Sequence, residues 1–292
     1  MQIATTMQPP IVFDRALIAR HLERRASDVD DFITRLALDD LSQRLLAVSR
    51  RFERALIMAP SAAALPTEGV SASGAFAFSR AATVLPSAGA PLLDAEAIAL
   101  PHTDYDLIVS IFDAQIVNDV VGFLARLRAH LRPDGLLLAA LPGGATLTEL
   151  REAFLEADAE LSGGAFARVA PFIQLGDAGG LLQRAGLKLP VTDVEPHTVR
   201  YGSPLALMAE LKTLGAQNPL ADRPARPMTR RLLAAASAAY ERLAADPDGR
   251  VRATLDIVWL SGWAQHESQQ KPLKPGSAAA SFRQVLGDKA KP

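Results

Sequence analysis

One uninterrupted apolar segment limits the possible folds more than any other feature of the sequence. Residues 106–112 read DLIVSIF, which is the pattern of a strand covered on both faces. Apolar residues at helical spacing follow in 120–131, and the turn sequence RPDG leads into a second apolar segment at 136–141. A buried strand, a helix and another buried strand in this order predict a parallel βαβ unit.

The rest of the chain continues this alternation. Strands are predicted at residues 55–58, 74–78, 83–85, 188–194, 198–201 and 251–259. Helices are predicted at 29–49, from a T-L-T-E capping box to about 161, from Asp177 to Gly186, at 203–215 and at 229–245. The pattern predicts an α/β protein with a doubly wound, mostly parallel sheet, added N-terminal helices and a helical insertion at about 203–247.

Composition and charge exclude several classes of function. The formal net charge of the 292 residues is −1, so no long-range attraction to nucleic acid is expected. The absence of cysteine excludes thiol nucleophiles and is compatible with the cytoplasm, and the five histidines show no metal-ligand spacing. Residues 1–10 do not resemble a signal peptide, and no apolar run reaches the ~20 residues of a membrane span. The expected divisions are a leader with helices at 1–50, a main domain at 51–265 and a polar tail at 266–292.

Several blocks resemble known proteins. Residues 105–110 (YDLIVS) and 131–135 (LRPDG) resemble the strand-4 to strand-5 block of class I S-adenosylmethionine methyltransferases. Longer blocks resemble a narrower subfamily, namely bacterial proteins related to the mitochondrial complex I assembly factor that hydroxylates an arginine. Malonyl-carrier-protein methyltransferase is a more distant relative. These blocks are GGATLTELR at 143–151, RVAPF at 168–172, LQRAG at 182–186 and GWAQHESQQKP at 262–272. The resemblance implies a seven-stranded, Rossmann-like sheet and S-adenosylmethionine as cofactor.

The segment that should hold this cofactor departs from the family pattern. The resemblance places an acidic residue and a G-x-G-x-G loop in residues 54–63, which read RALIMAPSAA. Ile57 stands at the acidic position, and Ala59, Ser61 and Ala63 stand at the glycines. Each adds a Cβ where the family keeps none, and Pro60 removes an N–H donor. These changes predict that cofactor binding is weakened or lost.

The resemblance also indicates the remaining candidate residues. The resemblance implies cofactor contacts from Ala59, Ser61, Ala63 and Ser110, and from Asp94 or Glu96 on the adenine side. No acid occurs in residues 69–93, where the family has a ribose ligand. The catalytic residues are unknown, and the candidates after the strand at 106–112 are Asp113, Gln115 and Asn118. The alternatives are a plain strand-to-helix turn at 59–63, a solvated turn at 94–96, and a helix cap at Asn118 with Asp113 and Gln115 exposed.

Three functions remain open from the sequence. The first is an S-adenosylmethionine-dependent methyltransferase of unknown substrate. The second is an assembly factor for a respiratory-complex protein, with hydroxylase-like chemistry. The third is a non-catalytic binding module whose partner is a client protein or a homologous methyltransferase.

Overall fold

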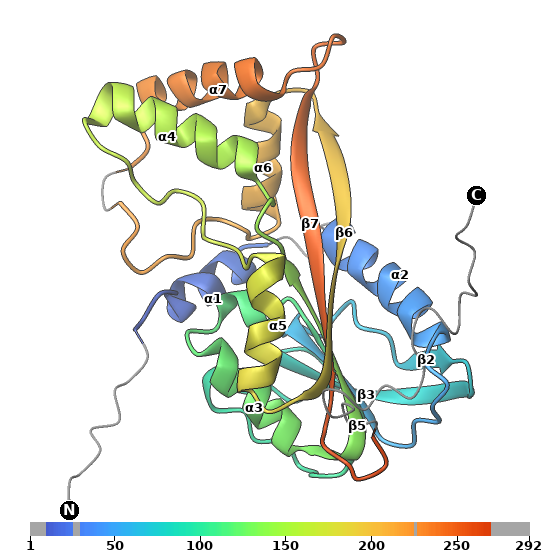
Figure 1. Ribbon diagram of the computed structural model, residues 1–292. Helices are drawn as coiled ribbons and strands as arrows, with labels where there is room; N and C mark the ends of the chain where they lie inside the picture. The colour runs from blue at the N-terminus through green and yellow to red at the C-terminus, as the bar shows by residue number, and fades with distance from the viewer. Residues whose placement is uncertain (1–9, 26–29, 225–226, 270–292) are drawn as a thin grey trace, which may run out of the picture.

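The computed structural model describes residues 10–25, 30–224 and 227–269, and it contains one seven-stranded sheet in the order β2-β3-β1-β4-β5-β7-β6 (Figure 1). Strands β3, β1, β4 and β5 pair in parallel, and β7 lies antiparallel between β5 and β6. The predicted doubly wound, mostly parallel sheet is therefore confirmed. The strands are β1 Ala55–Ser61, β2 Glu68–Ser71, β3 Gly74–Leu85, β4 Tyr105–Ile111, β5 Leu131–Pro142, β6 Lys188–Tyr201 and β7 Val251–Trp263.

Helices cover both faces of the sheet. One buried cluster joins α3 and α5 to the face that carries Leu56 and Ile108, and another joins α2 to the face that carries Ile57 and Trp259. A third cluster packs α4, α6 and α7 together beside the N-terminal end of β7 (Figure 1). The helices are α1 Arg15–Glu23, α2 Phe32–Leu46, α3 Val120–Ala129, α4 Thr148–Ser162, α5 Leu175–Arg184, α6 Pro204–Thr213 and α7 Arg230–Ala244, with short 3-10 turns η1 Ala95–Ala97 and η2 Ala114–Ile116.

Two predicted helix starts are correct, at Ser203 and Thr229, whose hydroxyls cap α6 and α7. The predicted capping box before α4 is wrong. Thr146 Oγ1 instead donates to the Asp256 carbonyl and accepts from the Asp256 N–H, and the Glu149 carboxylate accepts from Thr254. These side chains attach the start of α4 to β7, because a partner on the neighbouring strand is available to them. Helix α5 likewise starts after Gln174 and not at Asp177.

Two strands are longer than the sequence predicts. One strand, β3, includes both predicted segments 74–78 and 83–85. Another, β6, includes both predicted segments 188–194 and 198–201. Pro196 lies between the two predicted segments of β6. That strand lies at the edge of the sheet, where a missing N–H removes no ladder hydrogen bond.

The connection after β1 is the main departure from the predicted βαβ pattern. Strand β1 continues through Ser61 and pairs there with Leu85 of β3. Residues 62–67 contain no helix and lead directly into β2, which pairs antiparallel with the start of β3. The first parallel crossover is therefore made without a helix.

Two further expectations concern the ends of the chain and membrane insertion. The expected leader and polar tail lie partly outside the described residues, at 1–9 and 270–292. Among the helices that are described, none has the length and apolar character needed to cross a membrane.

Candidate functional site

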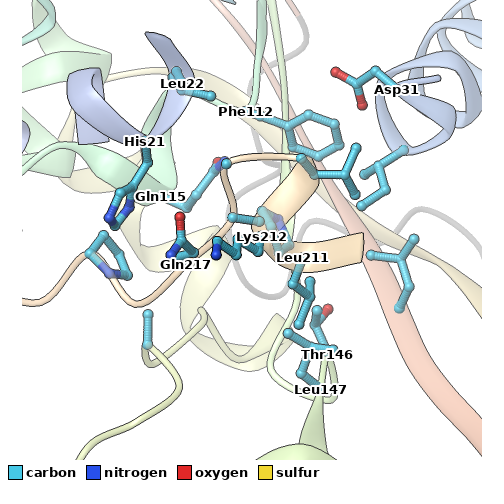
Figure 2. A pocket seen from close by; sticks show the side chains of 18 of the residues that line it. His21, Leu22, Asp31, Phe112, Gln115, Thr146, Leu147, Leu211, Lys212 and Gln217 are labelled. Atoms are coloured by element: carbon cyan, nitrogen blue, oxygen red, sulfur yellow. The ribbon is translucent and has the colours of Figure 1, made fainter. Parts of the chain in front are cut away.

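A cavity of about 1300 Å³ opens beyond the carboxyl ends of β1, β4 and β5 (Figure 2). Helices α1 and α2 form part of its wall, and α6 with the loop at 214–219 forms another part. In doubly wound sheets ligands bind at this edge, where the strand order reverses. The cavity is therefore the candidate functional site.

Some of the predicted site residues line this cavity and others do not. Ala59, Ser61, Ala63 and Gln115 line the cavity. The other predicted residues are not part of its lining, and these are Asp94, Glu96, Ser110, Asp113 and Asn118.

The backbone donors at the end of β1 already have partners inside the protein. The Ala62 N–H donates to Ser87 Oγ at 3.0 Å, and the Ala63 N–H donates to Ser61 Oγ at 3.4 Å. Pro60 has no N–H to offer. Because no helix follows, there is also no helix N-terminus here to stabilise an anionic group.

Asp113 forms a buried cluster with two hydroxyl groups. Its carboxylate accepts from Thr83 Oγ1 at 2.5 Å and from Ser110 Oγ at 2.8 Å, and it has no exposed surface. Burial raises its pKa to about 6, although the two hydrogen bonds and the Arg15 charge act to lower it. Thr83 lies near the end of β3, so this cluster joins the carboxyl ends of β3 and β4.

Asn118 and Glu96 hold the N-terminal segment against the sheet. Asn118 Oδ1 accepts from the N–H groups of Val12 at 2.7 Å and Phe13 at 2.9 Å, and its amide donates to Glu96 Oε1 at 2.9 Å. The predicted helix cap at Asn118 is wrong, because Asp119 caps α3. The side chain of Asn118 is instead committed to the segment that precedes α1.

Arg15 adds a second attachment that the sequence analysis missed. Its guanidinium donates to the carbonyls of Ile116 at 3.1 Å and Thr83 at 3.2 Å. Nothing in the spacing of the N-terminal residues marks this arginine. Its partner Thr83 lies near the end of a strand, where the resemblance expects a ribose ligand. That position was the one signal in the sequence that could have pointed to Thr83.

The polar groups of the cavity come mostly from residues that sequence reasoning left aside. In Figure 2 the polar ends of His21, Gln115, Lys212 and Gln217 occupy one side of the cavity. His21 is 8% exposed, and burial lowers its pKa. Its Nδ1 has no hydrogen-bond partner in the part of the chain that the structure describes, and the same is true of Gln115 Oε1. Within the described ranges no group of three or more His, Cys, Asp or Glu residues could hold a metal ion.

Comparisons with known proteins point to two groups of relatives. The chain is 39% identical over 184 residues to the mitochondrial arginine-hydroxylase NDUFAF5 of Dictyostelium discoideum, covering 62% of this chain and 42% of that protein. It is 36% identical over 189 residues to the malonyl-[acyl-carrier protein] O-methyltransferase of Laribacter hongkongensis, covering 65% of this chain and 61% of that protein. The matches thus span between two fifths and three fifths of these relatives.

No protein-family model matches the chain. Among solved structures, phosphoethanolamine N-methyltransferase 2 of Haemonchus contortus superposes with a TM-score of 0.40 at 14% identity, over 86% of this chain and 57% of that one. The sequence relatives and the strand order agree with the resemblance found in the sequence blocks. The chain is therefore similar in sequence, over about two thirds of its own length, to the NDUFAF5 arginine-hydroxylases and to the malonyl-[acyl-carrier protein] O-methyltransferases.

Proposed function

We propose that this protein is a non-catalytic binding module with a methyltransferase fold, which acts as an assembly factor for a client protein. The observation that carries the proposal is the connection after β1, where residues 62–67 lead into β2 without a helix. In the arrangement that the fold implies, a helix would follow β1. Its N-terminus, together with the glycine loop before it, would supply the hydrogen-bond donors for the amino-acid part of S-adenosylmethionine.

The residues at this edge do not fit the cofactor in the arrangement that the fold implies. Ala59 is part of a paired strand, and the N–H groups of Ala62 and Ala63 already donate to serine hydroxyls. At the end of β3, Thr83 donates to Asp113, and its carbonyl accepts from Arg15. The groups that could hold the ribose and the methionine portions are therefore bonded within the protein.

The identity of the client follows only from the relatives. Two of the relatives, 39% and 36% identical to this chain, are named arginine-hydroxylases NDUFAF5, and the resemblance associates that subfamily with respiratory-complex assembly. We propose a respiratory-complex subunit as the client, with a homologous methyltransferase as the other candidate partner, and the cytoplasm as the compartment.

The test is isothermal titration of the full chain with S-adenosylmethionine and, separately, with S-adenosylhomocysteine. The malonyl-[acyl-carrier protein] O-methyltransferase of Laribacter hongkongensis serves as a positive control. The loss of a charge-assisted contact weakens binding by about 1.5–3 kcal/mol, or about 10- to 100-fold. We expect no heat from this chain at ligand concentrations that saturate the control. Binding in the micromolar range by a folded sample would overturn the proposal.

A second candidate function is methyl transfer from S-adenosylmethionine bound in a different pose. It is favoured by the cavity, which reaches Ala59, Ser61 and Ala63 at the carboxyl end of β1. When bound, the cofactor supplies an electrophilic methyl group, and the protein has to orient the acceptor. Micromolar binding in the titration above would favour this candidate over the first.

A further inference from the structure

The cavity combines a mainly apolar wall with one polar side. In Figure 2 Phe112 and Leu147 lie away from the side on which the polar ends of Gln115 and Lys212 are found, and Leu211 lies next to Lys212. Its volume of about 1300 Å³ exceeds the roughly 300–1000 Å³ of an ordinary small-molecule pocket. Such a space suits an extended apolar ligand with a polar head.

Contacts between α1 and α6 form the polar side of the cavity. A Cβ placed on Gly215, just after α6, would lie 3.2 Å from the His21 carbonyl and 3.1 Å from Leu22. The end of α1 and the end of α6 are therefore in direct contact. This brings Lys212, in the last turn of α6, to the same part of the cavity as the end of α1.

Among the described residues, one cation of the cavity lining, the exposed Lys212, has no ion pair. Each arginine of the lining forms a salt bridge, and the pairs are Arg25 with Asp31, Arg35 with Asp30, Arg168 with Asp158 and Arg223 with Asp14. In residues 10–25, 30–224 and 227–269, Lys212 has no carboxylate within salt-bridge distance. Asp39 is the remaining acid of the lining, and it lies one helical turn from Arg35 on α2.

Two amide groups lie beside this cation. Gln115 and Gln217 are on the same side of the cavity as Lys212 (Figure 2). Each carries an NH2 group that can donate hydrogen bonds. A head group that carries negative charge would therefore complement Lys212 and accept from these two amides.

We propose that the cavity binds an amphiphilic carboxylate, with its apolar chain along the wall that includes Leu147 and Leu211 and its carboxylate at Lys212. This inference goes beyond the proposed function and does not depend on it, since it concerns a ligand other than S-adenosylmethionine. Lys212 also lies where its charge interacts favourably with the C-terminal end of the α6 dipole. The experiment therefore has to separate ligand affinity from helix stability.

The experiment measures displacement of 11-(dansylamino)undecanoic acid from the full chain by three ten-carbon amphiphiles. Decanoate is the test ligand, decanol is the neutral control and decyltrimethylammonium is the cationic control, all below their micelle or solubility limits. We expect decanoate to displace the probe at least tenfold more effectively than either control. Equal displacement by decanoate and decanol, or no binding of the probe, would overturn the proposal.

Two variants locate the head group. Lys212→Met keeps the aliphatic stem but removes the charge, so decanoate should bind about tenfold more weakly while decanol is unchanged. Lys188→Met, at an exposed position on the edge strand β6, is the matched control and should change neither. If Lys212→Met lowers the melting temperature but leaves decanoate affinity at the wild-type value, the lysine serves only the helix and the proposal fails.

A third variant tests the apolar chain. Leu211→Trp places a larger ring in the wall of the cavity and should weaken decanoate and decanol together, with circular dichroism to verify the fold. Unchanged affinity for both in a folded sample would contradict the position assigned to the chain.

Discussion

The two halves of the sheet organise the carboxyl ends of their strands in different ways. From β4 to β5 the chain follows the regular pattern, in which a strand, a capped helix and a parallel strand pack around Ile108 and Leu124. From β1 to β3 the helix is absent, and a short strand and a turn make the same parallel connection. Both halves contribute buried residues to the core, but the regular half (β4 to β5) contains a helix between its parallel strands, whereas the rebuilt half (β1 to β3) contains none.

The largest expected effect comes from the regular half. Ile108 is fully buried in the central strand β4, so Ile108→Ala should lower the free energy of unfolding by about 2–5 kcal/mol through lost burial and the cavity left behind. Val70 lies on β2 in the rebuilt half and is 52% exposed. Val70→Ala should change stability by no more than about 0.5 kcal/mol. Urea denaturation of both variants measures the contrast, and equal losses would contradict the burial of Ile108 in the core and the exposure of Val70.

The next largest effect concerns the cluster that joins the two halves, in which Thr83 of β3 and Ser110 of β4 both donate to Asp113. The pKa of this carboxyl rises from 3.8 to about 6 on folding because of burial. Between these pH values the folded state binds more protons than the unfolded state. The contribution of Asp113 to stability should therefore fall as the pH rises from about 4 to about 6, by about 3 kcal/mol in total, and remain level above.

The variant Asp113→Asn tests this pH dependence. An amide cannot ionise, so the fall in stability attributed to Asp113 should disappear from denaturation curves recorded between pH 4 and 7. Asp94→Asn, at an exposed position, is the control and should keep the wild-type profile. If the profiles of Asp113→Asn and the wild type coincide, Asp113 does not titrate in this window.

The sequence predicted the regular half better than the rebuilt half for a physical reason. The strand at 106–112 and the helix after it are specified by local patterns of burial, which are visible in the residues themselves. The hydrogen bonds that attach Thr146 and Glu149 to β7 connect residues about 105–110 positions apart. The local T-L-T-E pattern therefore predicted a helix cap instead. The contacts of Arg15 with Thr83 and Ile116 span 68 and 101 positions and left no local signal.

The candidate site was only partly predictable. The carboxyl edge of the sheet follows from topology, and four predicted residues do line the cavity there: Ala59, Ser61, Ala63 and Gln115. The walls come from α1, α2 and α6, whose packing over this edge depends on tertiary contacts. For that reason His21, Lys212 and Gln217 could not be assigned to the site from the sequence.

A smaller effect is expected at the end of β5, where the regular half meets β7. A Cβ on Gly143 would lie 2.7 Å from Val258 Cγ2 and 3.0 Å from Asp256 Cβ. Gly143→Ala should therefore lower the free energy of unfolding by about 1–3 kcal/mol through overpacking. Gly164→Ala is the control, since a Cβ there meets nothing within 4 Å. Similar urea midpoints for the two variants would show that the contact of Gly143 with β7 is not close in solution.

The smallest expected effect decides how the end of β1 should be understood. If residues 59–63 formed a cofactor loop blocked only by side chains, Ala59→Gly would restore a family glycine and increase affinity for S-adenosylmethionine. In the structure Ala59 is 4% exposed and pairs with Ala82 of β3. Glycine inside a strand is less stable than alanine by about 0.5–1 kcal/mol. We therefore expect Ala59→Gly to lower stability by about that amount in urea denaturation and to leave titrations with S-adenosylmethionine without heat. A gain in affinity would instead mean that the missing helix is unnecessary for binding, and that the two halves differ less in function than they do in structure.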